Sequence, residues 1–299
     1  MRDKSWPRND CGGGAEALAF RVKACLEALR PINSAMLGFA VIVGAAIAAG
    51  GPPPLSASLY AFATGFFVGA SAMVLNDIVD VDVDKINAPG RPIPSGRLSL
   101  KAAWACFVAL TLAGLASAAA TGRYTLAIAL AAWGVASLYD VWGKRSGLPG
   151  NVMVAFNVAV PLIYGEALVG RFSPAVTVFW AMVFLTALAR EVAKGIADVE
   201  GDRLAGVRTV AVSRGTRAAA MLAALLYAAA VALSPVPLLR GWVDPMAYGV
   251  PVAVVDALLA LAAARLLASP VKLVALWHKR LVLLAMLLGL IGFYLGVTV

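Results

Sequence analysis

Nine long apolar runs divide the chain, each close to the roughly 20 residues that an α-helix needs to cross the hydrocarbon core of a bilayer. They cover residues 33–50, 55–75, 102–121, 124–141, 151–170, 174–193, 217–236, 246–267 and 280–298. Most are rich in Ala, Leu and Val, and small side chains let membrane helices pack closely. The pattern predicts an all-α, polytopic membrane protein with nine transmembrane helices in one bundle.

The basic residues predict how these helices are oriented. If the N-terminus is cytoplasmic, all but three of the 25 Lys and Arg residues fall on the cytoplasmic side, and only Arg123, Arg171 and Arg240 face outward. Such a bias is typical of the inner loops of membrane proteins. We therefore expect a multi-pass protein of the cell membrane, with residues 1–30 in the cytoplasm and residues 31–299 forming a single transmembrane domain.

A short apolar pattern precedes the first run. Leu18, Val22, Cys25, Leu26 and Leu29 recur at helical spacing, which predicts an amphipathic helix lying in the cytoplasmic interface. Its simplest role is anchoring.

The composition supports a membrane environment and excludes several classes of function. Hydrophobic residues make up 62% of the chain and charged residues only 14%, whereas soluble domains carry about 25% charged residues. The net charge of +9 arises from basic residues between apolar runs, so we expect no nucleic-acid partner. A single histidine, His278, and three cysteines without a C-x-x-C pair argue against His-based metal or Ser-His chemistry and against a disulfide scaffold.

Half of the 16 acidic residues fall in two short stretches, each at the cytoplasmic end of an apolar run. In the first stretch, Asp77, Asp80 and Asp84 are spaced i, i+3, i+7 and share one helix face, with Asp82 on the opposite side. Like charges on one stripe destabilise a helix. A divalent cation removes that penalty, and ligands that are all oxygen suit Mg²⁺.

The second stretch resembles the first. Lys194, Asp198 and Asp202 step by four residues along one helix face, and residues 198–204 align with residues 80–86 at an offset of 118 residues. This predicts a four-helix unit used twice, with a ninth helix added. Two acidic stripes on one side of a bundle would enclose a site for metal ions and a polyanion. The alternative is that these acids balance neighbouring Lys and Arg in solvated loops.

These motifs resemble the signatures of the UbiA family of intramembrane prenyltransferases. The first signature runs from Asn76 to Asp84 as N-D-x-x-D-x-x-x-D and continues to residues 91–97, R-P-I-P-S-G-R. Residues 190–202 resemble the second, and their D-V-E-G-D ending is most similar to the family's archaeal lipid branch. Residues 30–33, and Tyr139 with Lys144, are also similar to family positions.

The sequence departs from the family pattern at three positions. Gly195 stands where many relatives carry a further Asp, so metal binding is expected to use fewer ligands here. Arg190 replaces a Tyr found in several aromatic-prenylating branches, and Asp140 replaces a more common Ser.

The resemblance implies nine helices around a central cavity, with the acidic motifs beneath cytoplasmic cap loops. It also implies Mg²⁺-dependent transfer of a polyprenyl group, with geranylgeranyl expected, from its diphosphate to an acceptor. The expected partners are a polyprenyl diphosphate, membrane lipids, and either geranylgeranylglyceryl phosphate or an aromatic acceptor such as 4-hydroxybenzoate. The expected metal ligands and catalytic residues are Asp77, Asp80, Asp84, Asp198 and Asp202, and the expected substrate-binding residues are Asn33, Asn76, Arg91, Tyr139, Lys144 and Lys194.

A transporter is the rival class, because acids within the membrane often line ion paths and internal repeats are common in carriers. Against it, both acidic stretches lie at one face, and only Glu166 and Asp256 are acids at membrane depth. Asp256 is expected either to line a pocket or to pair with a neighbouring helix. A soluble terpene synthase with Asp-rich motifs is excluded, because this chain lacks the residues for a polar exterior.

Overall fold

The computed structural model describes residues 22–204 and 206–299. Within them it contains helices and no strands, and nine helices are long and apolar enough to cross a membrane. The nine are α2 (Pro31–Ala49), α3 (Leu55–Val79), α5 (Leu100–Thr121), α6 (Arg123–Val141), α7 (Leu148–Val169), α8 (Pro174–Leu204), α10 (Thr216–Leu233), α12 (Pro245–Ala268) and α13 (Lys272–Thr298). The predicted fold class is confirmed.

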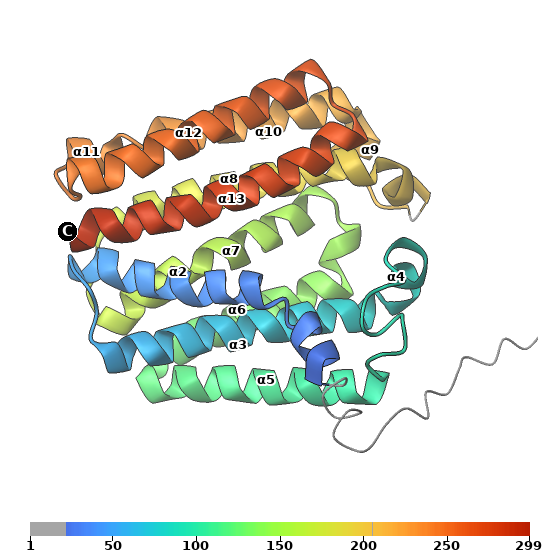
Figure 1. Cartoon of the computed structure of the whole chain (residues 1–299), viewed down its shortest axis with the longest axis horizontal. Helices are drawn as coiled ribbons and strands as arrows, with labels where there is room; N and C mark the ends of the chain where they lie inside the picture. Colours follow the sequence, from blue (N-terminus) through green and yellow to red (C-terminus); the bar gives the residue numbers. More distant parts are fainter. Residues whose placement is uncertain (1–21, 205) are drawn as a thin grey trace, which may run out of the picture.

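Shorter helices lie in the connections. They are α4 (Val81–Asn87), α9 (Val210–Arg214), α11 (Val236–Leu239) and the 3₁₀ helix η1 (Gly143–Arg145). Figure 1 shows α4 and α9 together at one end of the bundle, and the C-terminus of the chain at the other end. We call the end that carries α4 and α9 the mouth end.

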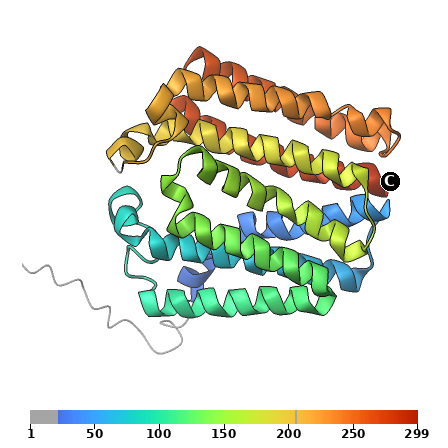
Figure 2. The ribbon, with the colours of Figure 1, turned by 180° about the vertical axis from the view of Figure 1, so that it is seen from behind.

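The long helices form one closed bundle (Figures 1 and 2). Going round it, α3 packs against α5 and α2, α2 packs against α7, and α7 packs against α8. The last helix, α13, contacts α12, α8 and α2, and so joins the second half of the chain to the first. The order of neighbours in α2–α3–α5–α6 recurs in α7–α8–α10–α12, while the proposed four-helix repeat itself stays a prediction.

Several helices extend beyond the apolar runs at the mouth end. The run predicted at 174–193 becomes α8, which continues to Leu204, and the run predicted at 280–298 becomes α13, which begins at Lys272. A helix satisfies its own backbone hydrogen bonds, so it does not have to end where the apolar side chains end. These polar extensions place charged side chains at the mouth end.

The two halves of the bundle meet closely where α2 crosses α7. Gly44 faces the backbone of Leu162, and a Cβ at Gly44 would overlap the Leu162 carbonyl oxygen. Gly165 lies in the same way against the backbone of Ala45. Small residues at such crossings let two helices approach to backbone contact in a membrane.

Residues 22–28 are helical and lie beside the mouth-end parts of α3 and α5. The side that packs on the bundle carries Ala24 and Ala28, which are buried against Val74 and other core residues. Of the apolar positions predicted from the sequence, Val22 and Leu26 point outward instead, and about half of each is exposed. The apolar pattern therefore serves two faces, one against protein and one free to contact lipid. Leu18 lies outside the described residues.

Candidate active site

A cavity of about 1560 Å³ opens between the two halves of the bundle and extends from the mouth end to Phe293. Its mouth is lined by charged side chains and its deeper walls by apolar ones. Of the predicted site residues, Asp77 is the only one that does not line it. The other predicted residues all line the cavity, and they are Asn33, Asn76, Asp80, Asp84, Arg91, Tyr139, Lys144, Lys194, Asp198 and Asp202.

The first acidic motif spans a break between α3 and α4. Asp80 ends one helix and precedes the next, yet its backbone N–H donates to the Asn76 carbonyl oxygen and the Asp84 N–H donates to the Asp80 carbonyl oxygen. The helical turn thus continues across the break, so Asp80 and Asp84 both reach the cavity. Asp82 points away, with 86% of its side chain exposed, and pairs with Lys85. The predicted division of faces holds for these residues.

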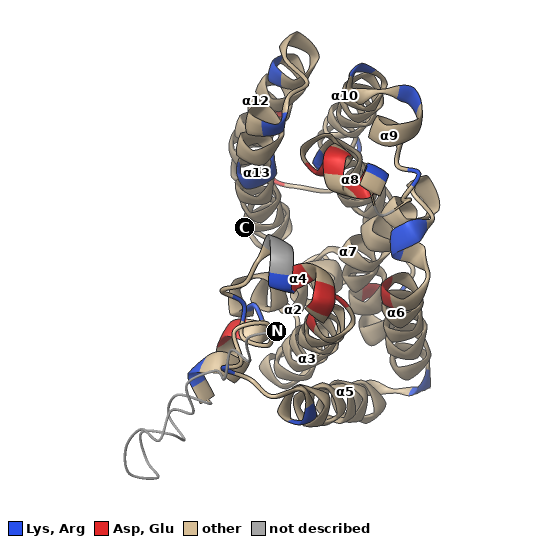
Figure 3. Ribbon diagram, turned by 90° about the vertical axis from the view of Figure 1, so that its right-hand side faces the viewer, with Lys and Arg blue, Asp and Glu red and all other residues tan. Residues whose placement is uncertain are grey.

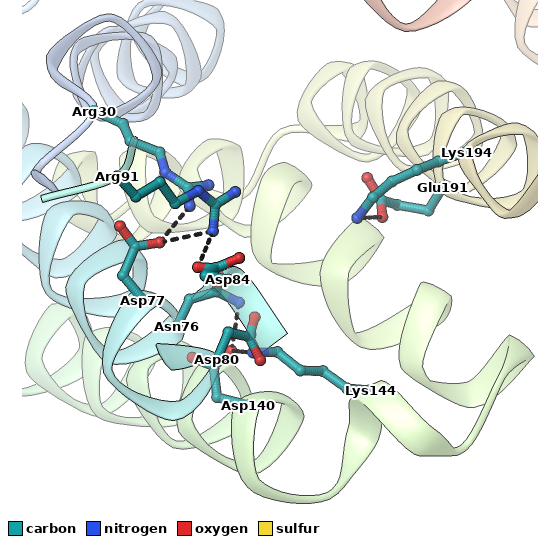
Figure 4. A network of polar contacts seen from close by, with 10 residues as sticks. All are labelled: Arg30, Asn76, Asp77, Asp80, Asp84, Arg91, Asp140, Lys144, Glu191 and Lys194. Carbon is teal, nitrogen blue, oxygen red and sulfur yellow. Dashed lines mark hydrogen bonds and ion pairs between the residues drawn. The ribbon is translucent and has the colours of Figure 1, made fainter. Parts of the chain in front are cut away.

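Asp77 lies behind two arginines. Its buried carboxylate accepts hydrogen bonds from Arg30 Nη2 at 2.6 Å and from Arg91 Nη1 at 3.3 Å, and Arg91 also pairs with Asp84 (Figure 4). Arg30 precedes Pro31 and has φ of 46°, and no other residue except glycine in the described chain has a positive φ. A conformation this unfavourable is kept where the surroundings hold it. The sequence pattern included Arg30 without giving it a role.

Lys144 holds a second polar group together. Its Nζ lies 2.8 Å from Asp80 Oδ2 and 3.0 Å from Asp140 Oδ1, and Asn76 Nδ2 donates to Asp140 at 2.9 Å. Asp140 is buried, so its carboxylate needs these partners. In the sequence, Asp140 stands out only as a departure from the family pattern. The signal available was its spacing of four residues from Lys144 on a helical run.

Residues of α8 form the facing wall of the cavity. Glu191 is buried and pairs with Arg190 at 2.9 Å and with Lys194 at 3.5 Å. Asp198 and Asp202 follow Lys194 towards the mouth, and no cation of the described residues lies within 4.0 Å of either carboxylate. Seen from the mouth end, acidic residues occupy α3, α4 and α6 on one side and α8 on the other (Figure 3).

The donor set at the mouth fits Mg²⁺. Asp80, Asp84, Asp198 and Asp202 present carboxylate oxygens to one cavity, and Mg²⁺ prefers oxygen ligands. Among the described residues, no three His, Cys, Asp or Glu side chains gather into a preformed metal cluster. Mg²⁺ often binds through one or two carboxylates together with waters and substrate phosphates.

The two acids expected at membrane depth have different surroundings in the structure. Asp256 lines the cavity and accepts a hydrogen bond from Ser234 Oγ at 2.6 Å, so both of its expected roles are present. Glu166 accepts from the backbone N–H of Ser173 at 2.6 Å, in the connection after α7. His278 is fully buried, with Nε2 2.9 Å from the Tyr227 hydroxyl, and it does not line the cavity.

Comparison with known proteins identifies the family. The model of the UbiA prenyltransferase family matches residues 37–284. The chain belongs to the UbiA prenyltransferase family. The digeranylgeranylglyceryl phosphate synthase of Archaeoglobus fulgidus is 37% identical over 279 residues, covering 92% of this chain and 95% of the relative. The synthase of the same name from Methanopyrus kandleri is 37% identical over 276 residues, covering 91% and 98%. This membrane protein is therefore a prenyltransferase.

Solved structures share the fold. A structure from a study of digeranylgeranylglyceryl phosphate synthase in membranes has a TM-score of 0.75 at 29% identity, and the match covers 93% of this chain and 98% of that one. A UbiA homologue from Archaeoglobus fulgidus bound to GPP and Mg²⁺ has a TM-score of 0.65 at 20% identity, with 90% and 99% covered. The family fold extends over nearly the whole chain.

Proposed function

We propose that this UbiA enzyme transfers a geranylgeranyl group from its diphosphate to geranylgeranylglyceryl phosphate, with Mg²⁺ as cofactor, at the cytoplasmic face of the membrane. The observation that carries the proposal is one cavity whose mouth holds two facing sets of carboxylates and whose interior is apolar. With Mg²⁺ on the carboxylates, that combination would suit an amphiphile with an anionic head and a long hydrocarbon tail. The cytoplasmic placement is supported by the basic residues that surround the mouth end.

The carboxylates of Asp80, Asp84, Asp198 and Asp202 are the residues that would hold Mg²⁺. When bound, the ion supplies Lewis-acid stabilisation of the diphosphate as the allylic C–O bond breaks. Asp77 contributes by holding Arg30 and Arg91 at the mouth.

The cations of the site would stabilise the negative charge on the departing diphosphate. Arg91 and Lys194 line the cavity from opposite walls and provide donors for diphosphate oxygens. Lys144 does the same from its position between Asp80 and Asp140. Asn76 keeps Asp140 in place through its amide, and Asn33 and Tyr139 complete the polar lining.

The apolar walls below the mouth exclude water from the allylic carbon, where water would capture the developing cation. The bond from that carbon to the diphosphate oxygen breaks, and its electron pair leaves on the diphosphate. The acceptor hydroxyl oxygen forms the new ether bond, and its proton passes to the departing diphosphate. The tail of the donor lies along the deeper walls.

A lipid acceptor is favoured over an aromatic one for two reasons. The two relatives described above match this chain over more than 90% of their own length, and both are named digeranylgeranylglyceryl phosphate synthase. The cavity is also lined by Arg145, Lys272 and Lys279, which the proposed diphosphate site does not use, and such cations suit an acceptor with a phosphate of its own. An aromatic acceptor such as 4-hydroxybenzoate remains the second candidate, and a transporter is disfavoured because the chain belongs to a prenyltransferase family.

Substitution of the carboxylates tests the site. Asp80→Asn and Asp202→Asn should each lower the rate of prenyl transfer by about 10²–10³-fold, the usual loss when one group that stabilises transition-state charge is removed. The matched control is Asp82→Asn, because Asp82 lies in the same motif but points away from the cavity. Full activity in both variants, with both proteins folded, would contradict the proposed site.

A further inference from the structure

One face of α13 lines the cavity along most of the length of the helix. Lys272, Lys279, Met286 and Phe293 are seven residues apart, which is close to two helical turns, and all four line the cavity. The face is therefore cationic at the mouth and apolar below. Such a stripe matches a second amphiphile with an anionic head, lying beside the donor.

The two lysines of this stripe differ from the cations near α3, because those cations already pair with carboxylates of the protein. Arg30 and Arg91 bind Asp77, and Lys144 binds Asp80 and Asp140. By contrast, no carboxylate of the described residues lies within 4.0 Å of the Nζ atom of Lys272 or of Lys279. Both lysines are exposed and line the cavity, so an anion in the cavity can reach their ammonium groups.

The position of α13 adds to this charge. The helix begins at Lys272, and the preceding residue, Val271, gives no side-chain cap to the first turn. The uncapped backbone N–H groups at a helix N-terminus favour phosphate. Lys279 lines the same cavity as Lys194 and Asp198, so the stripe on α13 shares this cavity with the proposed donor site.

We propose that Lys272 and Lys279 form the binding site for the phosphate of the lipid acceptor, with the acceptor tail along the apolar part of α13. The inference rests on the proposed function and deepens it. In the proposed function the carboxylates of α3, α4 and α8 would hold the Mg²⁺ that binds the donor diphosphate. A phosphate on α13 places the acceptor from the side, so that its free hydroxyl faces the allylic carbon. The lysines act as specificity residues for a monophosphate lipid.

Kinetics with two acceptors test the assignment. Geranylgeranylglyceryl phosphate and its dephosphorylated form, geranylgeranylglycerol, are compared in Lys279→Gln and in the double variant Lys272→Gln/Lys279→Gln. The KM for the phosphorylated acceptor should rise about 10-fold or more, as expected for loss of a hydrogen bond to a charged group. The KM for the prenyl diphosphate should change less than about 2-fold, since binding energy is lost only at the acceptor. Preference for the phosphorylated acceptor should fall by the same factor.

The matched control is Arg280→Gln, because Arg280 neighbours Lys279 on α13 but does not line the cavity; it should keep the wild-type acceptor preference. Lys279→Arg should restore much of the preference. The subsite is overturned if the double variant keeps the wild-type preference, or if it raises the KM for the prenyl diphosphate instead. A third outcome also overturns it. Anionic bilayer lipid is added to neutral vesicles at a fixed acceptor concentration, and the activity of the wild type changes while that of the double variant does not. The ligand of the two lysines would then be a bilayer headgroup. If wild-type enzyme prenylates neither acceptor, the proposed function itself fails.

Discussion

Asp77→Asn separates two roles for the buried carboxylate of the first motif. The sequence predicts Asp77 as a metal ligand, whereas in the structure it faces Arg30 and Arg91 and does not line the cavity. The substitution keeps the size of the side chain and one acceptor oxygen but removes the charge. We expect a less stable protein whose Mg²⁺ requirement is unchanged.

The size of the stability loss follows from the contacts. Hydrogen bonds to charged groups contribute about 1.5–3 kcal/mol each, and neutral ones about 0.5–1.5 kcal/mol. The side chains of Arg30 and Arg91 are 34% and 36% exposed, so solvent screens both pairs and the lower values apply. With the amide retaining part of the bonding, the free energy of unfolding should fall by about 1–2 kcal/mol.

The assay is unfolding of the purified protein in mixed micelles by SDS titration, together with the Mg²⁺ concentration that gives half-maximal activity. Asp82→Asn is the control, because an exposed i,i+3 pair contributes only about 0.2–0.5 kcal/mol. Asp84→Asn should raise the Mg²⁺ requirement and serves as the positive reference. Asp77→Asn unfolding at the same SDS concentration as Asp82→Asn would refute the stabilising role. A Mg²⁺ requirement raised as far as in Asp84→Asn would instead make Asp77 a ligand.

Two further predictions concern the scaffold. Gly44→Ala should lower the free energy of unfolding by about 1–3 kcal/mol, because its Cβ would meet backbone across the α2–α7 crossing. The control is Gly134→Ala, whose Cβ would have no atom within 4 Å and which should be neutral or stabilise by up to about 1 kcal/mol. If both variants unfold at the same SDS concentration, the close crossing is contradicted. The hydrogen bond from Arg97 lowers the pKa of Glu27 below its ordinary value of 4.5, so this link between residues 22–28 and the loop before α5 is present above that pH and is lost as the pH falls through the lowered pKa. The protection of residues 22–28 against hydrogen exchange, relative to the intrinsic exchange rate at each pH, should therefore fall as the pH drops through this lowered pKa. Glu27→Gln should show the reduced protection at every pH.

The fold was predictable because its determinants are local. In a bilayer, an apolar run of about twenty residues is stable as a helix, which hydrogen-bonds its own backbone groups. All nine spans could therefore be placed from the positions of the apolar runs along the chain. Their ends could not, because the polar continuations of α8 and α13 have no hydropathy signal that separates helix from loop. The small-residue crossing of α2 and α7 depends on which helices meet, and no local pattern encodes that.

The site was predictable where helical spacing groups side chains on one face. Asp80, Asp84, Asp198 and Asp202 line the cavity as that spacing indicates. The spacing failed to show that Asp77, in the same motif, is turned towards cations brought from other segments. Arg30 comes from the start of α2 and Arg91 from the loop after α4, so their meeting is a property of the assembled bundle.

The most direct measurement is diphosphate release by the purified protein in neutral lipid vesicles, with labelled geranylgeranyl diphosphate, Mg²⁺ and one acceptor at a time. We expect release that requires both Mg²⁺ and geranylgeranylglyceryl phosphate, with label recovered in a lipid that carries two prenyl chains. Release supported by 4-hydroxybenzoate and not by the lipid would contradict the proposed acceptor. Solute flux across the vesicles without any diphosphate release would contradict the enzymatic account as a whole.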